Sequence, residues 1–250
     1  MNKKGSEKYL LIIGGNSDIA KSCAIEFAKN SFNLILTTTD KNKLEEFSKH
    51  VSNLFNVNVI IEELDVLNFS YHLEFWNKVK NYNIEVVLVA VGYLGDQKLA
   101  EQNFEEALKI ININYTALVS LFNIISNDLE KKQKGTIIGI SSVAGERGRK
   151  SNYIYGSSKA AFSCYLDGLR HRLYSSNVHV ITVKPGLVYT KMTSHLKLPK
   201  LLTATPEKIA KDIYKAYIKK IDTLYTPYFW KIIMNIIKLI PEKFFKKTNL

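Results

Sequence analysis

Short apolar runs alternate with longer helical patterns along most of the chain, and this alternation limits the possible folds more than any other feature. Five runs have the length and composition of strands, at residues 9–13, 33–38, 57–64, 86–91 and 136–140. Helical patterns follow them, up to residue 30, at 41–54, at 68–82, at about 101–129 and from about 153 onward. Such alternation predicts an α/β fold with one parallel sheet and helices on both faces. No internal repeat or linker interrupts the pattern.

The first predicted strand ends in a glycine turn that leads directly into a helical pattern. The turn and the start of the helix contain Gly14, Asn16, Ser17, Asp18 and Ile19. Backbone N–H groups at such a helix N-terminus bind phosphate, so the turn predicts a dinucleotide site in a single Rossmann-type, doubly wound sheet. Asp18 and Ala20 replace the usual later glycines, and we expect Asp18 to turn back and cap the helix. The alternative is an ordinary capped turn.

The end of the second predicted strand indicates which dinucleotide would bind. In this fold that end lies beside the adenosine ribose, where an acidic residue favours NAD and a basic or hydroxyl environment favours the 2′-phosphate of NADP. Here Thr37, Thr38 and Thr39 precede Asp40 and Lys41. Asp40 falls slightly late for the ribose, whereas the threonines and Lys41 could hold a phosphate. We therefore expect NADP(H) in preference to NAD(H), with Thr38 and Thr39 among the contacts.

Three residues between positions 142 and 159 have the types needed for proton transfer. Tyr155 and Lys159 are four apart, which places them on one face of a helix. A neighbouring ammonium group favours a phenolate, so we expect Lys159 to lower the pKa of Tyr155 from about 10 toward neutrality. Such a tyrosine exchanges a proton with a carbonyl or alcohol oxygen, and Ser142 could donate a hydrogen bond to the same oxygen. The alternative is a surface tyrosine packed on a lysine stem.

Asn114 lies among apolar residues in the helical pattern at 101–129, so we expect its side chain to be buried. A buried asparagine must be hydrogen-bonded. It either bridges backbone groups in the core or holds a water molecule in a proton relay.

Together these motifs resemble the short-chain dehydrogenase/reductase family over about residues 9–221. The resemblance implies a catalytic tetrad of Asn114, Ser142, Tyr155 and Lys159, in the family's order and spacing. It also implies hydride transfer between a nicotinamide and a carbonyl carbon. Tyr155 would give the proton to the oxygen, and Ser142 would orient that oxygen. Lys159 would hold the nicotinamide ribose, and Asn114 would hold a water that links Lys159 to solvent.

The same resemblance assigns the remaining cofactor contacts. Asp65 and Val66 match the pair that contacts the adenine, and Thr190 matches the threonine that contacts the nicotinamide amide. The loop after the fourth strand lacks the family's two asparagines, but its glycine still allows a close approach to a ribose. The implied contacts beyond the first turn and the threonines are Asp65, Val66, Ala90, Val91, Gly92, Tyr155, Lys159, Pro185, Gly186, Val188 and Thr190. No metal site is expected.

A basic segment between Ser142 and Tyr155 should pass beside the substrate pocket. It contains Arg147, Arg149 and Lys150. Arginine pairs bidentately with phosphate oxygens, so these residues suggest a phosphate on the substrate. The alternative is a solvated basic loop.

Residues 228–250 form a basic, amphipathic extension of a domain that spans residues 1–227. The apolar residues of this extension follow helical spacing and include Phe229, Ile232, Ile233, Ile236, Ile237 and Ile240. A broad apolar face flanked by lysines and Trp230 suits a helix at a membrane interface, so residues 228–247 predict contact with a membrane surface. The alternative is a helix packed on the core or on a partner subunit.

The basic loop and the tail together resemble the decaprenylphosphoryl-2-keto-erythro-pentose reductases within that family. The similar stretches are residues 144–162, the segments around Asn114 and after the fourth strand, and the tail from residue 226. This resemblance implies reduction of a 2-keto sugar, linked through phosphate to a polyprenyl lipid, in cell-envelope glycan biosynthesis. It also implies a flavin oxidase as partner. The family further implies a homo-oligomer formed through the helices that start near residues 101 and 153.

Two alternative functions fit the same motifs. A general ketone or 3-oxoacyl-thioester reductase could use Arg147 and Arg149 to meet the phosphopantetheine of a carrier protein. A nucleotide-sensing binding protein could share the fold, although it would not require Tyr155 and Lys159 together. Nucleic-acid binding is the least expected function. The basic residues behind the net charge of +12 are spread along the chain, and no aromatic residues interleave with a basic groove.

Cysteine content and the N-terminus bear on location. Cys23 and Cys164 fall in helical patterns, and we expect both to be buried free thiols in a reducing compartment. The apolar run before the first glycines is too short for a signal peptide. No run of about 20 uncharged apolar residues suits a membrane-spanning helix. We expect a cytoplasmic protein, peripheral at the inner face of the membrane.

Overall fold

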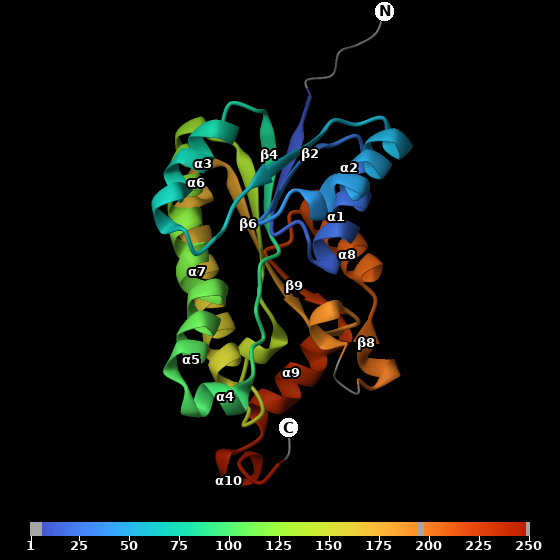
Figure 1. Ribbon diagram of the computed structural model, residues 1–250. Helices are drawn as coiled ribbons and strands as arrows, with labels where there is room; N and C mark the ends of the chain where they lie inside the picture. The colour runs from blue at the N-terminus through green and yellow to red at the C-terminus, as the bar shows by residue number, and fades with distance from the viewer. Residues whose placement is uncertain (1–6, 195–197, 249–250) are drawn as a thin grey trace, which may run out of the picture.

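A seven-stranded parallel sheet forms the centre of the computed structural model, which describes residues 7–194 and 198–248 (Figure 1). The strand order is β3-β2-β1-β4-β5-β6-β9. The strands are β1 (Tyr9–Ile13), β2 (Asn33–Thr38), β3 (Val59–Glu63), β4 (Ile84–Val89), β5 (Gly135–Ile140), β6 (Val178–Pro185) and β9 (Thr223–Thr226). The predicted doubly wound sheet is thereby confirmed. Its order reverses between β1 and β4, where ligands bind in such sheets.

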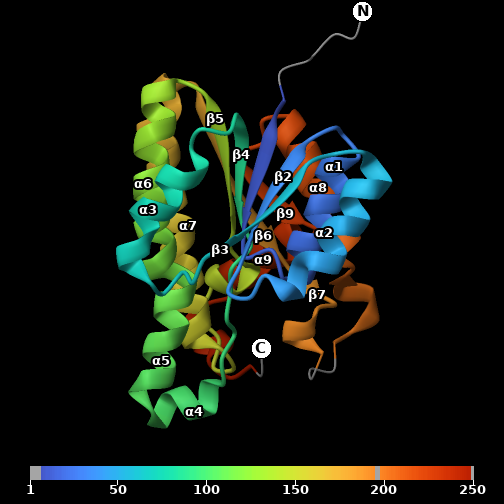
Figure 2. The ribbon, with the colours of Figure 1, turned by 45° about the horizontal axis from the view of Figure 1, so that its top comes forward.

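Helices cover both faces of the sheet, as the alternation predicted (Figure 1, Figure 2). On one face lie α1 (Asp18–Ala28), α2 (Asn42–Phe55) and α8 (Pro206–Ile218), and on the other α3 (His72–Val79), α6 (Ala117–Lys132) and α7 (Tyr153–Leu173). Successive side chains of a strand point to opposite faces, so Leu10 and Ile12 enter the first core layer and Leu11 the second. Both faces of β1 are therefore buried, which explains its uninterrupted apolar sequence.

The long helix predicted at residues 101–129 is interrupted twice. α4 (Gln97–Gln102) ends at Asn103, whose extended backbone precedes α5 (Phe104–Ile111) and whose side chain accepts a hydrogen bond from Glu105 N at 3.0 Å. Residues 112–116 then form a wider π turn before α6. The helix predicted at 68–82 is also shorter, because a 3-10 turn at Phe69–Tyr71 precedes α3.

By length and composition alone, the run Phe104–Lys132 could cross a membrane. In the fold, however, its second half supplies Leu118, Phe122 and Ile125 to the core layer beneath the sheet. Packing inside the protein therefore accounts for part of the apolar character of this run.

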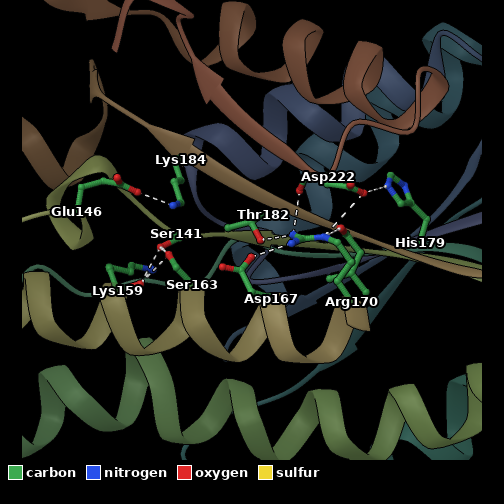
Figure 3. A network of polar contacts seen from close by, with 11 residues as sticks. Ser141, Glu146, Lys159, Ser163, Asp167, Arg170, His179, Thr182, Lys184 and Asp222 are labelled. Atoms are coloured by element: carbon green, nitrogen blue, oxygen red, sulfur yellow. Dashed lines mark hydrogen bonds and ion pairs between the residues drawn. The ribbon is translucent and has the colours of Figure 1, made fainter. Parts of the chain in front are cut away.

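Arg170 of α7 fastens the edge strand β9 to its neighbour β6 (Figure 3). Its guanidinium donates to Val180 O at 2.9 Å, to Thr182 Oγ1 at 2.7 Å and to Asp222 O at 3.0 Å. Asp222 Oδ1 also lies 3.0 Å from His179 Nε2. These bonds tie the turn before the short strand β9 to the sheet, so the segment that follows β9 starts from a fixed position.

The C-terminal extension is helical and packs on the rest of the chain. It forms α9 (Phe229–Leu239) and α10 (Glu242–Phe245), and a two-residue ladder of β7 (Leu187–Val188) and β8 (Thr203–Ala204) lies near its start. α9 buries Trp230, Met234 and Ile237 in a cluster with Val143. Core packing, one of the two interpretations of the tail, is thus observed. The outermost parts of the predicted domain ranges, residues 1–6 and 249–250, lie outside the described residues.

The two cysteines differ in burial. Cys23 is buried in α1, where burial raises the pKa of its thiol. Cys164 is exposed, contrary to the prediction that both thiols would be buried. The reason is its position on α7, whose buried side is formed by residues such as Phe162, Leu166 and Leu169.

Candidate active site

Two adjoining cavities open at the carboxyl ends of the central strands. The first, of about 450 Å³, is lined by Ser142, Tyr155 and Lys159 among others. The second, of about 360 Å³, lies toward β2 and β3. The two cavities share wall residues, namely Asn16, Ser17, Ala90, Val91 and Gly92. One extended ligand can therefore occupy both, as a dinucleotide would.

The residues assigned to the cofactor from sequence line one of these cavities, except Lys41, which lines neither. Besides the shared residues, the first is lined by Asp18, Ile19, Tyr155, Lys159, Pro185, Gly186, Val188 and Thr190. The second is lined by Gly14, Thr38, Thr39, Asp65 and Val66. The residues present thus fit a nicotinamide dinucleotide, and the individual contacts stay predictions.

The glycine turn after β1 is packed too closely for a side chain at position 14. Gly14 has a φ of +89°, and a Cβ there would lie 2.8 Å from Val91 Cγ2. The prediction that Asp18 caps α1 is wrong, because Ser17 Oγ accepts the hydrogen bond from Ala20 N at 3.1 Å. The Asp18 carboxylate instead accepts from Lys191 N at 2.7 Å and joins two sides of the first cavity.

Tyr155, Ser142 and Lys159 meet on one wall of the first cavity. Tyr155 and Lys159 lie one turn apart on α7. Ser142, in the loop after β5, forms a hydrogen bond with the Tyr155 phenol. Lys159 is 2% exposed, and its Nζ donates to Ile140 O at 3.1 Å. The same Nζ lies 5.8 Å from the centre of the Tyr155 ring. The arrangement offers a carbonyl oxygen two hydroxyl donors with a buried amine behind them.

The ionisation of Tyr155 corrects the expectation from sequence. Burial raises the pKa of Tyr155 to about 12, and the hydrogen bond from Ser142 lowers it by less. Burial also lowers the pKa of Lys159 to about 7. Desolvation is the largest cause for both groups, so it outweighs any stabilisation of the phenolate by the lysine. In the protein without cofactor, Tyr155 is therefore a protonated phenol at neutral pH, which suits a proton donor in carbonyl reduction.

Asn114 is fully buried in the π turn between α5 and α6, as expected. Its amide donates to Tyr93 O at 2.6 Å and to Ile110 O at 2.8 Å, and its Oδ1 accepts from Tyr93 N at 3.1 Å. The side chain thereby joins the loop after β4 to the helix. The structure thus shows the bridging of backbone groups, while the holding of a relay water stays a prediction.

Arg147 is engaged by the C-terminal segment and lines neither cavity, so its predicted contact with substrate stays a prediction. Its guanidinium donates to Ile237 O and to Ile240 O, the latter at 2.7 Å, and pairs with Glu242 at 3.1 Å. Its central carbon lies 3.7 Å from the centre of the Phe245 ring. Arg147 therefore clamps the end of α9 to α10. Its partners lie about 90 residues away in the sequence, so local patterns could not reveal them.

Glu146 makes a second link to the C-terminal segment. Its buried carboxylate pairs with Lys184 of β6 and, at 2.7 Å, with Lys238 of α9 (Figure 3 shows the first pair). Burial raises the pKa of Glu146, but the hydrogen bonds and charges of the two lysines outweigh burial and leave the pKa below its usual value. Glu146 is therefore ionised at neutral pH and holds α9 against the sheet.

Arg149 does line the first cavity. Its Nε is buried and makes no hydrogen bond with the described residues, and its Nη2 lies 3.4 Å from Met234 Sδ. Burial lowers the pKa of Arg149 from its usual value. Lys150 is exposed and lines neither of the two cavities, so its contact with substrate stays a prediction.

Trp230 is a cavity residue that the sequence pattern does not indicate. The indole lies directly over Gly186, because a Cβ at that position would fall 1.8 Å from Trp230 Nε1. The same Nε1 donates to Leu202 O at 3.3 Å. Trp230 therefore forms part of the wall beside the segment expected to meet the nicotinamide. Its one sequence signal, an aromatic ring at the start of an apolar helix, was interpreted as a membrane anchor.

Comparisons with known proteins define the class to which this chain belongs. The family model for short chain dehydrogenases matches residues 8–200, so the chain belongs to the short-chain dehydrogenase/reductase family. It is 27% identical over 235 residues to an uncharacterized oxidoreductase of Mycobacterium tuberculosis, covering 93% of this chain and 94% of that protein. It is 28% identical over 190 residues to an NADP-dependent 3-hydroxy acid dehydrogenase of Schizosaccharomyces pombe, covering 74% and 73%.

A solved structure agrees with this assignment at the level of the fold. A short-chain dehydrogenase from Sphingobium yanoikuyae, in complex with NADPH, matches with a TM-score of 0.81 at 20% identity, covering 94% of this chain and 97% of that one. The protein is an NAD(P)-dependent oxidoreductase that acts on CH–OH and C=O groups. The nicotinamide supplies the hydride when bound. We expect Tyr155 to hold the proton that the substrate oxygen receives.

Replacing Tyr155 by phenylalanine should abolish most turnover and spare cofactor binding. The ring still fills its place, but the proton donor is lost, so kcat should fall about 10²- to 10⁴-fold. Steady-state reduction of a ketone and fluorescence titration with NADPH measure the two effects. Tyr153→Phe, two residues earlier on an exposed position of α7, is the matched control. A wild-type rate for Tyr155→Phe would assign the proton to another group.

Lys159 should make the stability of the cofactor-free protein rise with pH. Its pKa is about 7 when folded and 10.5 in the ordinary reference state, so between these values unfolding takes up a proton. The cost of the buried charge is present in full below pH 7 and is relieved as the pH increases. Relative to Lys159→Met, the wild-type free energy of unfolding should increase by up to about 1.4 kcal/mol per pH unit from pH 7 to 9. Urea denaturation at several pH values tests this, and a constant difference would contradict it.

Arg147→Met should loosen α9. Carbonyl oxygens that Arg147 now satisfies would lose their donor, so the free energy of unfolding should fall by about 1–3 kcal/mol. Amide hydrogen exchange in residues 229–245 should accelerate. Arg172→Met removes an exposed arginine paired with Glu130 and should cost less than about 1 kcal/mol. Equal effects of the two substitutions would argue against the clamp.

Proposed function

We propose that the protein reduces, with NADPH, a keto group on a sugar that carries a phosphate. The observation that carries this proposal is the position of Arg149. Its guanidinium lies in the wall of the cavity that also contains Tyr155 and Ser142. An anion bound to Arg149 would therefore lie in the same cavity as the carbonyl that is reduced.

The hydrogen-bonding groups of Arg149 are only partly satisfied by the described residues. Its Nε has no hydrogen-bond acceptor among the described residues, and its contact with Met234 is to a sulfur, which accepts weakly. A buried N–H of a guanidinium without an acceptor destabilises the folded protein, and pairing with an anion offsets that cost. The planar fork of arginine matches two oxygens of a phosphate. Arg147 is not equivalent, because Glu242 and backbone carbonyls already satisfy it.

Asn152 supports a substrate with hydroxyl groups. It lines the same cavity, and its Oδ1 is buried without a hydrogen bond from the described residues. A sugar hydroxyl would donate to this oxygen, whereas an aliphatic ketone would leave it unpaired. Asn152 and Arg149 together favour a phosphorylated sugar over an apolar ketone.

The surroundings of the second cavity support NADPH over NADH. Thr38 and Thr39 line it, and the Thr39 hydroxyl could donate to a 2′-phosphate, whereas Thr38 Oγ1 already donates to Asp40 O at 2.9 Å. Asp40 does not line it, because its carboxylate accepts from Asn42 N at 3.1 Å at the start of α2. The Asp40 carboxylate, which would favour a ribose hydroxyl, is therefore bonded at the start of α2 and not in the cavity. The name of the S. pombe relative and the NADPH in the Sphingobium structure agree with this preference.

The finer proposal is a 2-keto pentose linked through phosphate to a polyprenyl lipid. The resemblance of the loop and tail to reductases of such sugars supports it, as does the apolar α9 beside the cavity. The keto sugar would have to be produced by oxidation of an alcohol, so a flavin oxidase acting on the same lipid-linked sugar is the proposed partner. The family resemblance supports a homo-oligomer formed through α4–α6 and α7.

A second candidate is a 3-oxo acid or its thioester. The similarity to a 3-hydroxy acid dehydrogenase favours it. In that case Arg149 would pair with a carboxylate or with the phosphate of a thioester carrier. Asn152 distinguishes the candidates, because a 3-oxo acid with an alkyl chain offers it no hydroxyl.

The test compares related substrates with NADPH and NADH in parallel. The substrates are a polyprenyl-phosphoryl 2-keto-pentose made by a flavin oxidase, a soluble 2-keto sugar phosphate, the same sugar without phosphate, and a 3-oxoacyl thioester. A charge-assisted hydrogen bond contributes about 1.5–3 kcal/mol, so removal of the phosphate should lower kcat/KM about 10- to 100-fold. Arg149→Met should cause a similar loss on the phosphorylated sugar alone. NADPH should exceed NADH by about 10-fold or more for the same reason.

Arg149→Lys and Arg172→Met are the matched variants. Lysine keeps the charge without the planar fork, so its kcat/KM should lie between those of the wild type and Arg149→Met. Arg172 lines neither cavity and should behave as wild type. Equal rates with and without the phosphate would reject the sugar phosphate. A preference for the 3-oxoacyl thioester would establish the second candidate.

A further inference from the structure

We infer that the outer face of α9, together with α10, is a docking surface for an anionic lipid bilayer. Four large side chains form this face, spaced by four, four and three residues: Tyr228, Ile232, Ile236 and Leu239. They are 67%, 55%, 60% and 81% exposed, and Phe244 of α10 is 60% exposed. We call these five residues the outer stripe.

α9 is apolar on two opposite sides, and the rest of the chain covers one of them. Trp230, Met234 and Ile237 point inward and are at most 8% exposed. The four residues of the outer stripe in or next to α9 point the other way, because residues three and four apart lie on one face of a helix. The apolar face predicted from sequence is thus divided: Ile237 belongs to the core, whereas Ile232 and Ile236 are left outside. Core packing therefore does not account for the second side.

The charge around the outer stripe selects an anionic partner. Residues 228–247 contain five lysines and one acidic residue, Glu242, which is paired with Arg147. Lys231, Lys243 and Lys246 are exposed beside the stripe. Apolar side chains next to lysines suit the headgroup region of an anionic membrane, where the apolar groups enter the acyl boundary and the lysines contact the headgroups.

The size of the stripe argues against a protein as its main occupant. A helix of 11 residues is about 16 Å long, and with a width of about 10 Å its outer face covers roughly 160 Å². A stable protein interface buries about 800 Å² on each partner. A bilayer has no such requirement, since peripheral helices bind through a few inserted side chains and several cations.

The position of α9 connects the docking surface to the first cavity. Trp230 on its inner side lines that cavity, so a bilayer at its outer side would lie about one helix diameter, or 10 Å, from the cavity wall. A substrate carried by a lipid could then reach Tyr155 without leaving the membrane. This consequence rests on the proposed function, whereas the docking itself does not.

Vesicle flotation of the full chain, without substrate or cofactor, tests the docking. The vesicles are phosphatidylcholine alone and phosphatidylcholine mixed with phosphatidylglycerol. We expect the protein to float with the anionic vesicles at least about 10-fold more than with the neutral ones, and high salt should reduce the bound fraction. Ile236→Asp with Leu239→Asp should reduce binding about 10-fold or more. Leu54→Asp is the matched control, because Leu54 on α2 is also 60% exposed.

A second variant and a second readout separate the outcomes. Lys243→Gln with Lys246→Gln alters exposed side chains only and should remove the preference for anionic vesicles, even if the aspartate variant does not fold. Light scattering reports the oligomeric state, and reduction of a soluble ketone reports the active site. Flotation that is absent in the wild type, or unchanged by both variants, would overturn the proposal. In one contrary result, the wild type does not float and the aspartate variant of the outer stripe forms smaller oligomers than the wild type. That result would assign the face to a second copy of the chain.

Discussion

The active site depends on the close packing of α7 against the end of β5. Ser141 Oγ donates to Lys159 O at 2.9 Å and hydrogen-bonds Ser163 Oγ at 2.7 Å (Figure 3). A Cβ at Gly145 would lie 2.7 Å from Ala160 N, so the turn after β5 touches the helix backbone directly. This contact buries Lys159 and covers part of Tyr155, and burial is the largest cause of both pKa shifts. The proton chemistry of the site therefore follows from how closely two backbone segments approach.

The segment after β5 also connects the active site to the end of the chain. Glu146 and Arg147 hold α9 and α10, while Arg149 faces the first cavity. The wall of the same cavity includes Trp230 of α9, the helix that this segment holds in place. The residues that face the substrate are thus held together with the C-terminal helix, although about 80 residues separate Arg149 from Trp230 in the sequence. One apolar side of α9 can then line the cavity while the opposite side contacts an external surface.

Prediction from sequence succeeded where the pattern is local. The bounds of β1 and β2 match those expected, because strands buried on both faces are apolar throughout and end abruptly at a turn. The helix at 101–129 was predicted as continuous, since its apolar spacing continues across both interruptions. The break at Asn103 depends on a side-chain cap, and the π turn accompanies the bonds of Asn114 to Tyr93 in another segment. Neither is visible in the hydrophobic period.

The sequence by itself determined the order of strands and helices, the residues at the strand ends and the spacing of Tyr155 and Lys159, because all of these depend on neighbours along the chain. The tertiary structure alone decided which charged groups are already paired. Arg147 and Arg149 look equivalent two residues apart, yet Ile240 O and Glu242 satisfy the first and a cavity faces the second. It also decided the ionisation of Tyr155, because desolvation depends on the segments that cover a group, and those segments come from distant parts of the chain.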